Sequence, residues 1–171
     1  IPYANVRSMA CGWSRQRPDD FEMHEILRSM EQGMAEGACG LSTGLDYIVE
    51  CFASTEELVE VSNSMAAHQG MYVSHVRYKK GTLAGVQEAV EIGSRANVPV
   101  HISHLKATTA RETDTLLEYI DRVAVNEVSF SFDVYPYLPG STMLNFLLPY
   151  NVWQDGPLAT IARLSDPTVR T

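Results

Sequence analysis

Long apolar runs and basic residues are both scarce in this sequence. The longest apolar stretches, such as residues 146–149, are far too short to span a membrane, and the first residues form no basic and apolar leader. Lys and Arg number 13 against 21 Asp and Glu, giving a net charge of −8 that disfavours nucleic acids and anionic membranes as partners. We therefore expect a cytoplasmic protein with neither nucleic-acid nor membrane partners.

Cysteine is also sparse, and no glycine-rich dinucleotide-binding loop is present. The three cysteines are odd in number and form no CxxC pair, which argues against both a disulfide framework and a thiolate zinc site. Cys39 lies between two small residues and is expected to be a buried core residue. With 171 residues, of which 45% are hydrophobic, the chain can fill one domain core.

Strand-like and helix-like segments alternate along the chain. Capping boxes at Asp19 and Ser54 predict two helix starts, and further helices are expected near residues 82–97 and 107–123. Strands are predicted over residues 5–10, 38–43, 71–76, 98–106 and 127–134. Alternating units with near-continuous apolar strands predict a parallel α/β sheet, and polar residues at several strand ends favour a barrel over a doubly wound fold.

The number of units is too small for a complete barrel. A (β/α)8 TIM-type barrel takes about 250 residues, whereas about five parallel βα units can be found here. We therefore predict a partial (β/α)8 barrel, whose open edges would favour self-association. The chain does not begin with Met, and we expect residues 1–171 to be an internal segment of a catalytic barrel domain, without its first and last strands.

Two strand ends carry a similar motif, YVSHVR at residues 72–77 and HISHLK at residues 101–106. His75 and His104 are 29 residues apart, close to the length of one βα unit, so both can stand at the same edge of the sheet. There they could be two ligands of a metal such as zinc, or hydrogen-bonded structural residues. By strand alternation, His101 is expected to face the helices as a structural residue, while His24 and His68 are expected on helix surfaces.

Other polar residues lie at the same predicted edge. Lys106 and Arg77 could hold a substrate carboxylate or could be structural cations, with Lys106 better placed for substrate. Tyr135 could donate a hydrogen bond to a developing oxyanion. Asp133 could be a metal ligand or general base, although a structural acceptor is the preferred interpretation, and Asp46 is expected on the same rim. The acidic residues that open the helix after Ser54, including Glu57, are explained by the helix dipole.

Five motifs together make a family resemblance specific. They are GACGLSTGLDY at 37–47, FASTEEL at 52–58, YVSHVR at 72–77, PVHISHLKA at 99–107 and DVYPYLPGST at 133–142. In this order they resemble the N-acyl-D-amino-acid deacylases (D-aminoacylases) of the amidohydrolase superfamily. The resemblance implies a metal-dependent TIM barrel that hydrolyses the amide bond of small N-acylated D-amino acids.

The resemblance also implies roles for individual residues. His75 and His104 are similar to the family's zinc ligands, and four residues are similar to its substrate-contacting residues: Tyr47, Lys106, Tyr135 and Ser141. The family's catalytic aspartate, its His-x-His pair and its metal-bridging side chain match no residue of this sequence, so the 171 residues alone are expected to be inactive and to bind zinc weakly or not at all.

Two alternatives stay open. The chain could be a non-catalytic, degenerate barrel segment that acts as a binding or assembly subunit. It could also belong to a cyclic-amide hydrolase of the dihydropyrimidinase type, although the placement of Lys106 beside His104 favours the deacylases.

Overall fold

The computed structural model describes residues 1–14 and 16–169. Within this part of the chain, four strands form one parallel sheet in the order β1-β2-β3-β4. They are β1 (Gly40–Gly44), β2 (Met71–His75), β3 (Val100–Ile102) and β4 (Phe130–Phe132). Since every strand pairs with the next one in sequence and the sheet stays open, the predicted partial barrel is confirmed.

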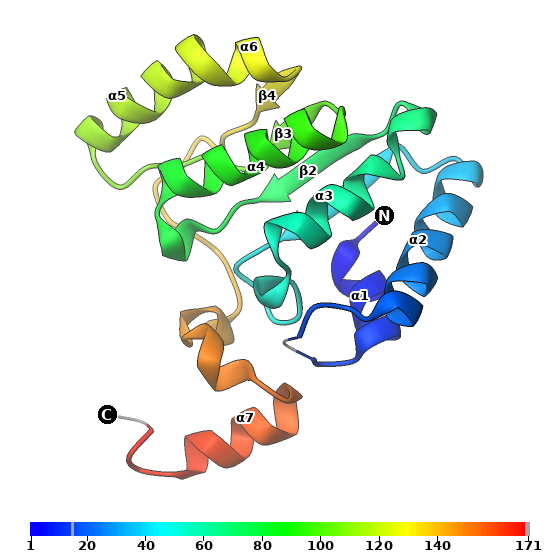
Figure 1. Cartoon of the computed structure of the whole chain (residues 1–171). Coiled ribbons are helices and arrows are strands. Elements are labelled where there is room, and N and C mark those ends of the chain that lie inside the picture. Colours follow the sequence, from blue (N-terminus) through cyan, green and yellow to red (C-terminus); the bar gives the residue numbers. More distant parts are fainter. Residues whose placement is uncertain (15, 170–171) are drawn as a thin grey trace.

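The connections between the strands are helical. Helix α3 (Thr55–Asn63) joins β1 to β2, and α4 (Thr82–Ala96) joins β2 to β3. The link from β3 to β4 consists of α5 (Ala110–Tyr119), a π-helical turn (Ile120–Ala124) and the short α6 (Val125–Glu127). Helix α2 (Asp20–Ala35) precedes β1, while α7 (Gly156–Ser165) lies away from the sheet near the C-terminal end (Figure 1).

Local sequence signals explain where these elements begin and end. Asp19 and Glu22 close a reciprocal capping box at the start of α2, as predicted, and Asn97 ends α4 in the left-handed conformation. Gly40 opens β1 at a point where a Cβ atom would lie 2.0 Å from the carbonyl oxygen of Met71. Only glycine allows these two strands to approach so closely.

The predicted strand over residues 5–10 is wrong, because this segment lies in helix α1 (Tyr3–Cys11). Its buried residues are Tyr3, Arg7 and Cys11, which recur every four residues as one face of a helix does. Arg7 concealed this face in the sequence because a charged residue is rarely fully buried. It is buried here because its Nε lies 2.7 Å from Glu57 Oε1.

That ion pair also corrects the interpretation of Glu57. Ser54 caps α3 as predicted, but the Glu57 carboxylate turns inward and accepts hydrogen bonds from Arg7 and from the Tyr3 hydroxyl. The pair therefore joins α1 to α3. Cys39 corrects another prediction: it is exposed at the start of the sheet rather than buried.

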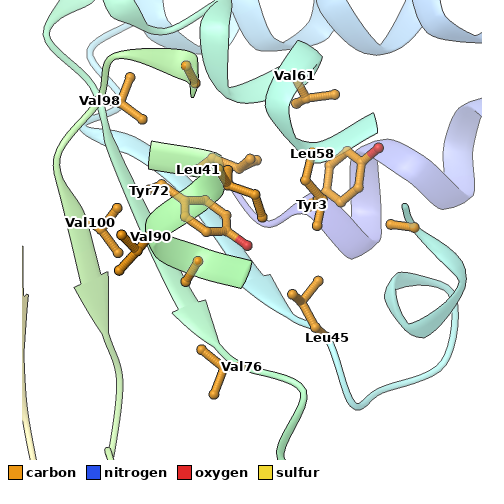
Figure 2. Close-up of a cluster of buried hydrophobic side chains, with 14 of the residues drawn as sticks. Tyr3, Leu41, Leu45, Leu58, Val61, Tyr72, Val76, Val90, Val98 and Val100 are labelled. Atoms are coloured by element: carbon orange, nitrogen blue, oxygen red, sulfur yellow. The ribbon is translucent and has the colours of Figure 1, made fainter. Parts of the chain in front are cut away.

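The main core lies between the sheet and its helices. Figure 2 shows Leu41, Tyr72 and Val100 from three strands packed with Leu58 and Val61 of α3 and with Val90 of α4. Several of these side chains are completely buried. Within the described part of the chain, no helix has the length and apolarity needed to cross a membrane.

Candidate active site at the carboxyl edge of the sheet

Two imidazole rings meet at the carboxyl ends of β2 and β3. His75 is the last residue of β2, and its Nδ1 lies 3.2 Å from Nε2 of His104. His104 follows β3 with φ of +42°, a conformation that is uncommon for a non-glycine residue. Because the backbone turns here, the His104 ring reaches the ring of His75 although His104 lies beyond the end of the strand.

Asp133 holds this turn in place. Its Oδ1 accepts a hydrogen bond from the backbone N–H of His104 at 2.7 Å, and its Oδ2 lies 2.9 Å from Nε2 of His101. The carbonyl of His104 accepts a hydrogen bond from the Tyr78 hydroxyl at 3.1 Å. The His101 contact, followed by the His104 N–H, lowers the pKa of Asp133. These contacts agree with a structural acceptor at Asp133.

The expected orientation of His101 is wrong. Val100 and Ile102 point into the helical core, so His101 points to the opposite face of β3, where it contacts Ser131 and Asp133. The prediction requires the strand to continue to His104. However, β3 ends at Ile102, and the turn at His104 breaks the alternation of faces. His24 is exposed and His68 pairs with Glu31 on the surface, as expected.

Asp46 supports the other side of the histidine pair. Its side chain is fully buried, and its Oδ2 lies 3.2 Å from Nε2 of His75. The Tyr150 hydroxyl and the backbone N–H of Lys79 also donate to this carboxylate. Burial opposes ionisation, but the hydrogen bonds from His75 and Tyr150 outweigh it and lower the pKa of Asp46.

The four predicted substrate-contacting residues line one cavity of about 150 Å³ together with both histidines. The Lys106 ammonium lies 3.6 Å from the centre of the Tyr78 ring, and burial lowers the pKa of Lys106. The Tyr47 hydroxyl is 3.0 Å from Oγ1 of Thr142. The complete lining is Tyr47, His75, His104, Lys106, Tyr135, Gly140, Ser141, Thr142 and Phe146.

Arg77 does not take part in this cavity, so its suggested contact with a substrate carboxylate is wrong. The residue is 2% exposed, and its Nε lies 2.9 Å from Glu88 Oε2 in α4. Its remaining N–H groups donate to backbone carbonyls of the loop after β1, including that of Cys51 at 2.9 Å. Arg77 is therefore a structural cation, which was the other interpretation of its position.

Several residues of this region were not assigned a role from the sequence. Asp46 was placed only on the rim, although its position next to Tyr47 at a strand end was a usable signal. Phe146 and Thr142 belong to a loop without periodicity, and no local pattern marked Phe146. Tyr78 follows Arg77, yet only the folded chain brings its hydroxyl to His104.

The histidine pair fits a metal ion in part. Two nitrogen ligands of a tetrahedral zinc ion lie about 3.3 Å apart, close to the 3.2 Å observed. The contact between His75 Nε2 and a carboxylate is the arrangement that commonly orients metal-binding imidazoles. Burial, followed by the charges of Lys106 and His75, lowers the pKa of His104, which favours the neutral form that binds metals. Among the described residues, however, no group of three His, Cys, Asp or Glu side chains could hold a metal.

The chain is similar in sequence to known proteins. No family model matches the sequence. A D-aminoacylase from Alcaligenes xylosoxydans xylosoxydans is 40% identical over 151 residues, covering 84% of this chain and 30% of the relative. An N-acyl-D-glutamate deacylase from the same organism is 30% identical over 149 residues, with the same coverage of 84% and 30%.

Solved structures give the same result. A D-aminoacylase variant in complex with CuCl2 has a TM-score of 0.77 at 31% identity, covering 85% of this chain and 32% of that one. An N-acyl-D-glutamate deacylase from Bordetella bronchiseptica, complexed with zinc and a phosphonate inhibitor, has a TM-score of 0.73 at 28% identity, covering 79% and 29%. The chain spans about 30% of the length of the curated relatives it matches. By sequence and by fold, it belongs to the D-aminoacylase family of amidohydrolases.

Proposed function

We propose that this chain supplies two zinc ligands and part of the substrate pocket of a deacylase that hydrolyses N-acyl-D-amino acids. One observation carries the proposal: His75 and His104 meet at 3.2 Å beside a cavity that is also lined by Lys106, Tyr135 and Ser141. In this proposal the residues form an internal segment of the catalytic barrel domain.

The histidine pair would hold the ion through His75 Nδ1 and His104 Nε2, the two nitrogens that face each other. A zinc ion bound there would polarise the acyl carbonyl and lower the pKa of a bound water to about 7. Asp46 would keep the His75 N–H on Nε2, leaving the lone pair of Nδ1 directed at the ion. Burial would keep His104 neutral at neutral pH.

The other lining residues would bind and orient the acylated amino acid. Lys106 is the one cation among the lining residues and would pair with the substrate carboxylate. The hydroxyl groups of Tyr135 and Ser141 would donate to the same carboxylate or to the carbonyl oxygen, and Tyr47 would form a side wall. Fixed donors of this kind lower the cost of ordering a polar substrate during the reaction.

The described residues do not provide a free general base beside the cavity. Asp46 is buried under hydrogen bonds from His75 and Tyr150, and Asp133 is occupied by His101 and the His104 backbone. Two imidazoles are also fewer than the three protein ligands of a typical catalytic zinc site. We therefore propose that the 171 residues alone do not turn over substrate.

A chimera tests the proposal, with this chain replacing the matching segment of the 40% identical Alcaligenes relative. The chimera should release the amino acid from N-acetyl-D-methionine but not from its L-enantiomer, and it should not open the ring of a dihydropyrimidine. His75→Ala or His104→Ala should abolish turnover and bound zinc, while Lys106→Met should mainly raise KM. Cleavage of the dihydropyrimidine alone would favour the cyclic-amide alternative.

One observation favours a second candidate, the assembly subunit. Apolar side chains are exposed along the strand end after β4 and on α7, including Leu138 at 101% and Leu158 at 83%. Such a surface is an association hazard unless another chain or segment covers it. Sedimentation of the 171-residue chain would test this: self-association should increase with concentration, whereas a monomer at all concentrations would contradict it.

A further inference from the structure

One wall of the cavity comes from residues 140–153, which we call the cover segment. Gly140, Ser141, Thr142 and Phe146 of this segment line the cavity. The Phe146 ring lies 5.3 Å from the ring of Tyr47 and 6.0 Å from the ring of His75. The position of the cover segment therefore decides the shape of the cavity beside the histidine pair.

Apolar burial holds only the end of this segment. Val152 and Trp153 are buried against Cys51, whereas Leu144 and Leu147 are 83% and 72% exposed. Apart from the Phe146 ring, the rest of the segment meets the sheet edge mainly through a few polar contacts. Thr142 contacts the Tyr47 hydroxyl, and Tyr150 donates to Asp46.

Lys79 makes the most extensive of these contacts. Its ammonium donates to the carbonyl of Leu148 at 2.9 Å. It also lies over three aromatic rings of the cover segment, 4.5 Å from the centre of Phe146, 4.8 Å from Trp153 and 5.1 Å from Tyr150. Lys79 is exposed overall, and partial burial lowers its pKa.

The backbone of Lys79 is linked to the histidine pair through Asp46. Its backbone N–H lies 3.3 Å from Oδ1 of Asp46, the carboxylate that also contacts His75. The same residue thus connects the support of the histidine pair to the wall of the cavity. Lys80, its neighbour in the same 3-10 turn, is also exposed, but its side chain forms no hydrogen bond, ion pair or ring contact in the described part of the chain.

We propose that Lys79 is a positioning residue, whose ammonium fixes the cover segment so that Phe146 and Ser141 hold their places around the substrate. The tether itself follows from the contacts of Lys79, whereas its effect on substrate rests on the function proposed above. Lys79 lies outside the cavity lining, so it acts through Phe146 and the backbone at Leu148 rather than by touching substrate.

Amide hydrogen exchange of the 171-residue chain tests this tether, with and without N-acetyl-D-methionine as a probe. In Lys79→Met the cover segment should exchange about two- to fivefold faster, because the cation contacts with the rings are lost. Lys79→Arg keeps a cation over the rings and should stay near the wild type, as should the matched control Lys80→Met. The probe should slow exchange in the wild type and in Lys80→Met, and less so in Lys79→Met.

Two failures can be told apart. Unchanged exchange of the cover segment in Lys79→Met would overturn the tether, whatever the probe does. Faster exchange in Lys79→Met with no effect of the probe on any variant would leave the tether standing and overturn its effect on substrate, whereas the proposed function is tested separately by the chimera. Amides of β2 and β3 report the global fold in the same experiment. If Lys79→Met does not fold, Phe146→Leu removes one of the rings that the Lys79 ammonium contacts and tests the same interaction.

Discussion

The helical side of the sheet and its carboxyl edge are held together in different ways. On the helical side, side chains such as Leu58, Tyr72 and Ile102 are fully buried in one continuous core. At the carboxyl edge, residues 133–147 leave Leu138 and Leu144 exposed, and apart from the Phe146 ring the contacts to this edge are polar ones to Asp46, Tyr47 and Lys79. Burial stabilises the fold on one side, while directional contacts position the cavity on the other.

The largest loss of stability is expected from a substitution in the core. Arg7→Ala should lower the free energy of unfolding by about 3–5 kcal/mol, because it leaves Glu57 buried without its cationic partner. Chemical denaturation measures this loss. Arg17→Ala removes an exposed pair with Glu60, where both side chains are more than 40% exposed, and should cost less than about 1 kcal/mol. Equal effects of the two substitutions would contradict the account of the core.

Glu50 lies where the two regions meet and should respond to pH. Burial is the main reason that its pKa rises to about 7, and its Oε1 has no hydrogen-bond partner. The unfolded chain ionises near the ordinary value of 4.5, so stability should fall as pH rises from there through about 7. Glu50→Gln keeps an acceptor for the Gly44 N–H and should remove this decrease of stability with rising pH.

The expected gain from Glu50→Gln is up to about 3 kcal/mol at pH 8 and close to zero at pH 4, where both states of the wild type are protonated. Denaturation curves at several pH values measure it. Glu56→Gln on the surface of α3 is the control and should change stability by less than about 0.5 kcal/mol. A gain that is the same at pH 4 and pH 8 would exclude ionisation as its cause.

A smaller and more local effect is expected at the carboxyl edge. Asp133→Ala removes the acceptor that holds the His104 N–H, at a cost of about 0.5–1.5 kcal/mol, because this hydrogen bond is exposed to solvent. The His104 ring should then lose its fixed place beside His75, and nuclear Overhauser contacts between the two rings should weaken. Asp133→Asn keeps an acceptor and should retain most of the contact. If Asp133→Ala left the ring contacts intact, the turn at His104 would have another cause.

The same comparison explains what could be predicted from the sequence. Helix α2, helix α4 and the strands between them were expected because capping residues and apolar periodicity are local signals that burial then selects. Helix α1 was missed because Arg7 breaks the apolar pattern, and its partner Glu57 lies 50 residues away. Local patterns carry no information about such a pair.

At the site, the sequence was informative about which residues gather but not about how they are held. The six residues predicted for the site line one cavity. The predicted orientation of His101 was wrong because a positive φ at His104 interrupts the strand alternation. The tether at Lys79 joins residues 69 positions apart through one ammonium group, and no spacing rule foresees such a contact.

We propose that His75 and His104 together bind one metal ion. Nitrogen-15 resonances of the histidine rings, followed during titration with Zn2+, test it directly in the 171-residue chain. We expect weak binding, in which the resonances of His75 Nδ1 and His104 Nε2 shift together at the same Zn2+ concentration, and in which His104→Ala removes the shift at His75. Independent shifts of the two rings, or a response confined to His24 or His68, would contradict it.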